Sequence, residues 1–330
     1  MGLLDIKPHQ VSRDLRGYSV FFYGAPKTGK TTTACKFPGA LLLAFEKGYS
    51  TIAGAMVQPI NSWSEFKKLF VEFKDPAVQE KFQTIVMDTA DIAYAYCEKY
   101  ICNRESDAKH DYQSVADIPY GKGYQLVMRE FDKCIRKILQ MDYGLVLISH
   151  AQDVTLKDEQ GVEYQQMMPT LDKRGRLVCE RTCDIIGLTR PVKQEDGRTV
   201  TKMFLRETPR YVAGSRFRYT PDVIDLSYDN LVKAINDAID KEAQETGNQY
   251  VTATKSNLYA ETDDEVYDFP VMMDEFSTLV GALMAKDLQN RSVISKVVAD
   301  YLGAGRKVAE CTEEDAGQLA LILQELRKLA

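Results

Sequence analysis

Residues Gly24-Ala-Pro-Lys-Thr-Gly29-Lys30-Thr31 fit the pattern G-x-x-x-x-G-K-[ST]. An apolar run of strand length, 18–23, precedes the pattern, and a run compatible with a helix, 32–37, follows it. Backbone N–H groups in such a loop lie at the positive end of the helix dipole and bind phosphate. The sequence therefore predicts a site for a nucleoside triphosphate.

We expect the ligand to be ATP, with Lys30 reaching its β- and γ-phosphates and the Thr31 hydroxyl coordinating Mg²⁺. The predicted nucleotide-binding residues are Gly24, Ala25, Pro26, Lys27, Thr28, Gly29, Lys30, Thr31 and Thr32.

Two carboxylates follow apolar runs and are candidates for catalysis. Asp88 ends the run 84–87 and is expected to bind Mg²⁺ with Thr31; the alternative is a cap for the next helix. Glu46 follows the run 41–45, which we expect to neighbour the phosphate-loop strand. There its carboxylate would polarise the attacking water. The alternative for Glu46 is an exposed side chain paired with Lys47.

Other groups also compete for roles in hydrolysis. Asp91 and Glu98 remain alternatives to Glu46 as the general base. His150 follows the run 145–149, so it would lie at the same sheet edge and sense the γ-phosphate. The alternative is a purely structural histidine.

The elements that must position these residues alternate along the first two-thirds of the chain. Apolar runs of strand length alternate with segments of helical periodicity, such as 63–73 and 124–141. This order predicts an α/β fold with a mostly parallel central sheet flanked by helices. Residues 184–189 and 199–206 favour a β-hairpin, and a closing helix is expected near 230–241.

The composition is that of a globular protein of 330 residues with 45% hydrophobic and 27% charged residues. No apolar run is long enough to span a bilayer, and no signal peptide is recognisable. Seven cysteines occur without a C-x-x-C pair, which favours reduced thiols over a zinc site. We expect a cytoplasmic protein without a membrane partner.

The C-terminal third differs from the rest in charge and pattern. Residues 221–330 carry 10 Lys and Arg against 21 Asp and Glu, whereas residues 1–220 have a net charge of +5. We expect a core at 1–245, an acidic polar linker at 246–268 and a small α-helical module at 269–330. The helical module is expected to dock a replication or recombination partner.

The order of these motifs resembles the RecA core. The similarity consists of a phosphate loop at 24–31 and strands followed by Glu46, Asp88 and His150. The segments Phe22-Tyr-Gly-Ala-Pro and Ile118-Pro-Tyr-Gly-Lys-Gly-Tyr124 also resemble phage-encoded RecA-like ATPases of the Sak type. The resemblance implies a RecA-like P-loop NTPase that anneals or recombines single-stranded DNA in the cytoplasm of a phage-infected cell.

The resemblance also implies DNA-binding segments and an oligomer, a ring or filament. Residues 103–122 and 153–176 would match the two DNA loops of RecA. Their candidate contacts are Tyr112, Tyr120, Tyr124, Tyr164, Lys122, Lys173, Arg174 and Arg176. Arg216 would act on the γ-phosphate of a neighbouring subunit, with Arg218 and Arg210 as competitors. Gly214 stands where such motifs carry a lysine.

Two other functions remain open at this level. A DnaB-like helicase or translocase would use the same core, although no accessory helicase domain is recognisable. A nucleotide-gated partner-binding protein would use the phosphate loop as a switch and the C-terminal helices to hold its partner.

Overall fold

The computed structural model describes residues 8–247, 250–255, 269–287, 290–303, 305–312 and 315–329. The chain divides into two compact units, Met1–Glu261 and Thr262–Ala330. Each unit has its own hydrophobic core. No helix among the described residues has the length and apolar character needed to cross a membrane.

The first unit is built on a mixed sheet with the order β11-β9-β8-β2-β6-β5-β3-β4. The parallel strands are β8 (Ile185–Lys193), β2 (Ser19–Gly24), β6 (Gly144–Lys157), β5 (Thr84–Asp88), β3 (Ala40–Ala44) and β4 (Met56–Pro59). The antiparallel strands are β9 (Thr199–Phe204), β11 (Val223–Asp225), β10 (Gly214–Ser215) on β8 and β7 (Glu163–Pro169) on β6.

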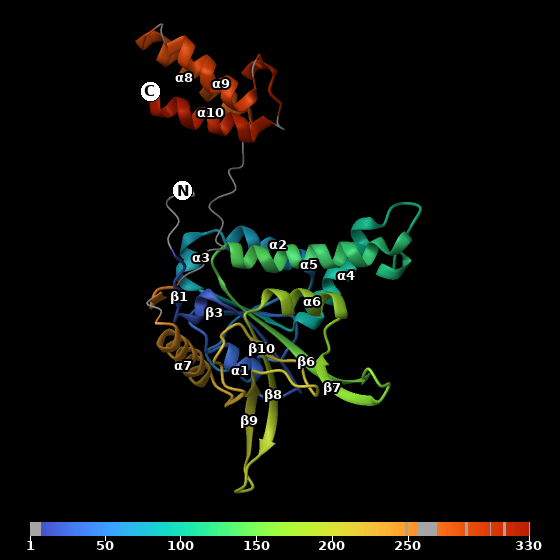
Figure 1. The fold of residues 1–330 in the computed structure, drawn as a ribbon. Coiled ribbons are helices and arrows are strands. Elements are labelled where there is room, and N and C mark those ends of the chain that lie inside the picture. The colour runs from blue at the N-terminus through green and yellow to red at the C-terminus, as the bar shows by residue number, and fades with distance from the viewer. Residues whose placement is uncertain are drawn as a thin grey trace. The chain divides into compact units, whose positions relative to one another are not determined.

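Helices cover both faces of this sheet (Figure 1). The helices α2 (Trp63–Glu72), α3 (Pro76–Lys81), α4 (Ala90–Glu105), α5 (Lys122–Gln140) and α6 (Lys173–Thr182) lie on one side. The helices α1 (Lys30–Ala34) and α7 (Tyr228–Thr246) lie on the other. The predicted α/β fold with a mostly parallel sheet is therefore confirmed.

Side chains of the central strands alternate between two cores because successive strand residues point to opposite faces. In β2, Phe21 packs into the core that contains α2, α4 and α5, and Phe22 packs into the core that contains α1 and α7. In β6, Leu147 and Ile148 divide in the same way. Burial on both faces explains why residues 20–23 of β2 and 145–148 of β6 form continuous apolar runs.

Short elements complete the first unit. They are η2 (Leu15–Gly17), η3 (Val115–Asp117), η4 (Pro119–Gly121) and the parallel pair of β1 (Val11–Ser12) with β12 (Val251–Thr252). This pairing places 250–255, which were expected in the linker, beside the N-terminal strand of the first unit. Residues 248–249 and 256–268 of that predicted linker lie outside the described residues.

The second unit contains α8 (Phe269–Lys286), α9 (Asn290–Leu302), η5 (Val308–Glu310) and α10 (Ala316–Leu329). Its core includes Leu283, Ile294, Leu319, Ile322 and Leu326. The apolar spacing expected at 319–326 therefore faces that unit's own core. The helical C-terminal module of the predicted fold is confirmed.

Several elements differ from the expectations. Helices α3 and α4 and the edge strand β4 were not foreseen, and α1 ends at Ala34, within the expected run 32–37. The expected neighbour relation between the 41–45 strand and the phosphate-loop strand is wrong, because β5 and β6 lie between β3 and β2. Strand order follows from long-range pairing, which periodicity along the sequence does not encode.

Candidate nucleotide-binding site

The glycine-rich loop begins where β2 ends and turns directly into α1. Gly29 caps α1 with φ of 89°, a left-handed conformation that glycine adopts without a steric cost. Gly24 is packed closely, because a Cβ there would lie 2.2 Å from Thr189 Oγ1 and 2.3 Å from Thr189 O. Thr28 Oγ1 lies 2.9 Å from the same Thr189 hydroxyl. Strand β8 therefore supports the loop from the side.

Lys30 is the first residue of α1, and its side chain is buried, with 5% exposed. Its ammonium donates hydrogen bonds of 2.9 Å to the carbonyl oxygens of Gly24 and Ala25. Burial lowers the pKa of Lys30, and the nearby carboxylates of Asp88 and Glu46 oppose that shift. The cation is thus held inside the loop by weak acceptors that phosphate oxygens can replace.

Thr31 and Asp88 meet at the mouth of the loop. Thr31 Oγ1 donates a hydrogen bond of 2.7 Å to Asp88 Oδ2. Burial raises the pKa of Asp88, the hydrogen bond from Thr31 opposes it, and the charge of Glu46 adds to it. A hydroxyl and a carboxylate are oxygen ligands that suit Mg²⁺. Among the described residues, no cluster of three or more His, Cys, Asp or Glu side chains that could hold a metal ion occurs.

Glu46 and His150 line the same cleft as the loop. Glu46 Oε2 lies 3.5 Å from His150 Nε2. A Cβ on Gly48 would lie 3.5 Å from Glu46 Oε1 and 3.7 Å from Asp88 Oδ2, so both carboxylates border the same small space. Glu46 reaches this position although β3 does not adjoin β2, because the register sets the ends of β3 and β5 level with Ile148 of β6.

These groups line one open cleft of about 410 Å³. Its lining residues are Pro26, Lys27, Thr28, Gly29, Lys30, Thr31, Thr32, Glu46, Gly48, Thr51, Ile52, Asp88 and His150. Of the predicted nucleotide-binding residues, Gly24 and Ala25 do not line the cleft but bind Lys30 through their carbonyls. Gly48, Thr51 and Ile52 were missed; their only signal was their place after an apolar strand.

Asp91 and Glu98, the two alternative candidates for the general base, lie outside the cleft. Asp91 Oδ1 accepts hydrogen bonds from Ser149 Oγ at 2.9 Å and Thr170 Oγ1 at 2.5 Å. Asp91 therefore links Ser149, within β6, to Thr170, the residue that follows β7. Glu98 lines a separate pocket on α4. Glu46, in contrast, lines the cleft together with Asp88, and its role as the base stays a prediction.

Arg216 lies at the opposite edge of the sheet. Its Nη1 lies 3.0 Å from Asp184 Oδ1, and its Nη2 donates to Arg181 O at 2.8 Å. Asp184 in turn accepts from the backbone N–H of Ser19, at the start of β2. Arg216 is therefore remote from the cleft of its own chain, and a role in another subunit's cleft stays a prediction.

The competing arginines are held differently. The Arg218 guanidinium lies 5.2 Å from the ring centre of Tyr219. Arg210 is exposed, and its side chain has no partner within the described part of the chain.

The two predicted DNA segments do not have the expected loop structure throughout. Residues 153–176 form the outer part of the β6–β7 hairpin, with Lys157 opposite Glu163, and the start of α6. The expectation of a loop there is wrong, since alternating side chains let this polar segment pair as strands. Residues 103–122 form the end of α4 and the short helices before α5. The Arg174 guanidinium stacks 4.1 Å from the centre of the Tyr124 ring, which lies on α5 just beyond the first segment.

Phosphate loops of this geometry occur in P-loop ATPases, which as a class use ATP and Mg²⁺, and the carboxylates at the same sheet edge place this chain among them. A family described as an AAA domain matches residues 16–217. This match covers more than half of the chain, so the chain belongs to that family.

The chain is also similar to two other proteins. The SPbeta prophage-derived uncharacterized protein YorG of Bacillus subtilis (strain 168) is 28% identical over 325 residues, which covers 97% of this chain and 95% of the relative. A crystal structure of a KaiC-like protein from Pyrococcus horikoshii OT3 covers 67% of this chain and 100% of its own, with 12% identity and a TM-score of 0.36.

Proposed function

We propose that this chain hydrolyses ATP with Mg²⁺ and uses the nucleotide to control its binding to single-stranded DNA in phage annealing or recombination. The observation that carries the proposal is the cleft itself, in which Lys30, the Thr31–Asp88 pair and Glu46 line one space. The ATP part rests on this geometry. The DNA part rests on the sequence resemblance and on the prophage origin of the YorG relative.

Each residue of the cleft has a separate task in this proposal. Lys30 exchanges its carbonyl partners for the β- and γ-phosphates. Thr31 and Asp88 would hold Mg²⁺, which would supply positive charge to the phosphates. Glu46 orients and polarises the attacking water.

The structure offers a direct route from the cleft to the β6–β7 hairpin. His150 lies beside Glu46, and its carbonyl accepts a hydrogen bond of 2.9 Å from the backbone N–H of Thr170. Asp91 binds the side chains of Ser149 and Thr170 at the same place. A shift of His150 toward the γ-phosphate would therefore move both strands of the hairpin where they leave the sheet.

In the assembled form, a homo-oligomer, Arg216 would approach the γ-phosphate bound by a neighbouring subunit. To do so, Arg216 would have to break its ion pair with Asp184. The arginine side of this pair is exposed to solvent, so breaking it costs little free energy. Mass photometry with and without a non-hydrolysable ATP analogue tests for assembly. A chain that stays monomeric with nucleotide and DNA would contradict the role of Arg216.

The test of the proposed function is ATP hydrolysis with and without single-stranded DNA, with Lys30→Ala as the blank. Turnover that rises with DNA and falls with salt is expected, because phosphate contacts release counterions. Annealing and unwinding assays then separate a recombinase from a helicase or translocase. Turnover that ignores DNA would contradict the DNA part of the proposal and leave the ATPase part standing.

A second candidate is a nucleotide-gated protein that binds a partner, and the separate core of the C-terminal unit favours it. Removal of residues 256–330 keeps β12 with the first unit and tests this role. We expect tighter DNA binding, because the acidic segment no longer repels the strand. Unchanged DNA affinity together with the loss of a bound replication protein would favour the second candidate.

A further inference from the structure

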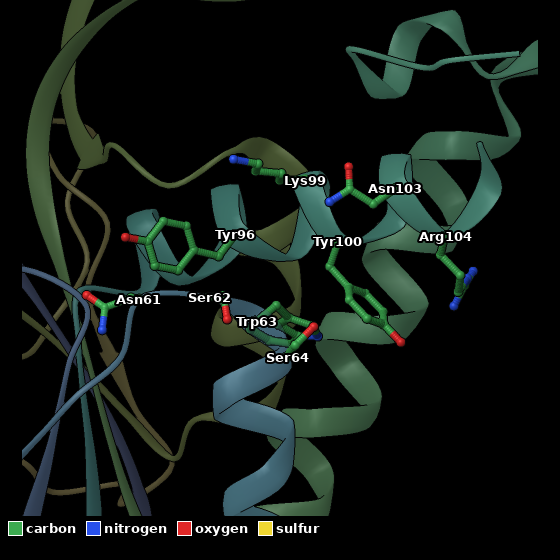
Figure 2. A pocket seen from close by; sticks show the side chains of 9 residues that line it. All are labelled: Asn61, Ser62, Trp63, Ser64, Tyr96, Lys99, Tyr100, Asn103 and Arg104. Carbon is green, nitrogen blue, oxygen red and sulfur yellow. The ribbon is translucent and has the colours of Figure 1, made fainter. Parts of the chain in front are cut away.

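A pocket of about 400 Å³ lies between the start of α2 and the second half of α4 (Figure 2). None of its lining residues lines the nucleotide cleft. Figure 2 shows Tyr96 and Tyr100 extending from α4 to different sides, with Trp63 at the start of α2 between them in this view. Lys99 and Asn103 lie on the α4 rim of the same pocket. The pocket is therefore a second, independent concave surface of the first unit.

Its aromatic side chains are fixed by contacts below the surface. The Tyr96 ring packs 6.1 Å from the ring of Phe45. Lys67 Nζ donates a hydrogen bond of 3.0 Å to the Tyr100 hydroxyl and lies 4.6 Å from the centre of that ring. Both tyrosines remain partly exposed. They offer rigid ring surfaces to a ligand at a small cost in side-chain entropy.

The charge of the pocket is positive. Its lining includes Lys99 and Arg104 and no carboxylate. Arg104 is partly compensated, since it donates to Glu105 Oε1 at 2.9 and 3.1 Å. Lys99 is exposed and has no partner among the described residues. Within the described part of the chain, Lys99 is thus an unpaired cation beside partly exposed aromatic rings.

A second pocket of about 480 Å³ shares Lys99 and Asn103 with the first. It is lined by Tyr112 and Tyr124, and Arg174 stacks on the Tyr124 ring. Glu98 is the one carboxylate among its lining residues. Because the two pockets share side chains, they adjoin along α4, and together they are called the α4 groove.

We propose that the α4 groove binds single-stranded nucleic acid, with bases stacked on its tyrosines and Lys99 on the backbone phosphate between the two pockets. The two adjoining pockets each offer aromatic rings, and a cation lies where they meet. This arrangement matches the alternation of bases and phosphates along a single strand. This inference rests on the proposed function, and it names the surface that takes the strand. It adds Tyr96, Lys99 and Tyr100, which lie outside both segments expected to bind DNA.

The test is binding of a fluorescein-labelled oligothymidylate to the full chain with an ATP analogue, over a series of salt concentrations. We expect Lys99→Glu to weaken binding about tenfold or more and to lower the slope of log affinity against log salt by about one. Lys133→Glu is the matched control, an exposed lysine on α5 that lines neither pocket. Both variants should keep the wild-type affinity for a fluorescent ATP analogue.

Crosslinking locates the strand independently of affinity. A bromodeoxyuridine-substituted strand, irradiated on the wild-type chain, should crosslink to the α4 peptide that contains Tyr96 and Tyr100. Equal binding by Lys99→Glu and Lys133→Glu, with crosslinks confined to the β6–β7 hairpin, would overturn the groove and leave the proposed function standing. Failure of the wild-type chain to bind the strand in any nucleotide state would overturn both.

Discussion

Lys30 and Lys99 are both lysines proposed to meet phosphate, but the chain holds them in opposite ways. Lys30 is buried in the loop, and its ammonium is bound by two carbonyl oxygens at 2.9 Å. Lys99 is exposed and has no partner among the described residues. Burial lowers the pKa of Lys30 and makes its position depend on the surrounding loop.

This difference between the two lysines fits different tasks for the nucleotide cleft and the α4 groove. A triphosphate at the first site has to be aligned for reaction, which requires donors fixed in advance. A strand in the α4 groove has only to be retained, and flexible cations beside aromatic rings tolerate any base sequence. Changes in the cleft should therefore affect the rate steeply, and changes in the groove should affect affinity gradually.

The largest effect is expected for Lys30→Ala. Loss of the cation that bridges the loop and the phosphates should lower ATP turnover by about a thousandfold or more. Turnover measured by phosphate release checks this, with Lys36→Ala as the control on the exposed end of the same segment. A comparable loss in both variants would mean that fixed placement of Lys30 has no special value.

Gly24→Ala tests whether the cleft depends on close packing. The added Cβ would collide with Thr189 Oγ1 and with its backbone oxygen, so the loop must move. We expect the first unit to lose about 3 kcal/mol and nucleotide affinity to fall with it. Trp63, the single tryptophan, is 1% exposed and reports unfolding of this unit by fluorescence.

The control for Gly24→Ala is Gly281→Ala, because that added Cβ meets nothing within 4 Å and lies inside helix α8. It should leave the Trp63 signal unchanged. A neutral Gly24→Ala would show that β8 does not support the loop.

Glu46→Gln separates binding from chemistry. The amide keeps the size of the side chain but is a much weaker base, so turnover should fall about a hundredfold with ATP-analogue affinity retained. Single-turnover hydrolysis checks this, and Glu80→Gln on exposed α3 serves as the control. Retained turnover would eliminate Glu46 from the proposed role.

Glu130→Gln probes the support beneath the α4 groove. Glu130 Oε1 accepts from Trp63 Nε1 at 3.1 Å and lies 2.8 Å from Lys67 Nζ. Burial pushes the pKa of Glu130 up, but the hydrogen bonds from Lys67 and Trp63 outweigh it and leave the pKa below its usual value of 4.5. We expect a loss of about 1–2 kcal/mol at neutral pH, measured by Trp63 fluorescence.

The pH dependence of that loss follows from the direction of the shift. A carboxylate with a lowered pKa in the folded state stabilises above its unfolded pKa and loses that contribution as pH falls through the folded value. The difference between wild type and Glu130→Gln should therefore shrink below about pH 4.5. If the stability difference between wild type and Glu130→Gln stays constant down to strong acid, the effect comes from the packing of the side chain and not from the charge of its carboxylate.

Asp91→Ala should have the smallest effect on turnover, about tenfold or less, because Asp91 positions the hairpin without lining the cleft. Hydrogen exchange in β6 and β7 should rise, since Ser149 and Thr170 lose a shared acceptor. A loss of turnover as large as that of Glu46→Gln, with no change in exchange, would make Asp91 the stronger candidate for the base.

Local features of the nucleotide site could be predicted from the sequence because their chemistry depends on neighbours along the chain. The pattern at 24–31 demands a glycine that permits the left-handed turn at Gly29 and a lysine at the first helical position. Fully apolar runs indicated the central strands, since a strand buried on both faces has no polar side. Glu46, Asp88 and His150 were found because each follows such a run.

What the sequence could not decide is which distant segments lie together. Only the strand order shows that β5 and β6 separate β3 from β2, that Arg216 lies at the edge away from the cleft, and that 153–169 pair as a hairpin. The α4 groove likewise joins residues near 61 to residues near 100. Local periodicity determined the elements, whereas burial of their apolar faces and pairing of their backbones decided which elements meet.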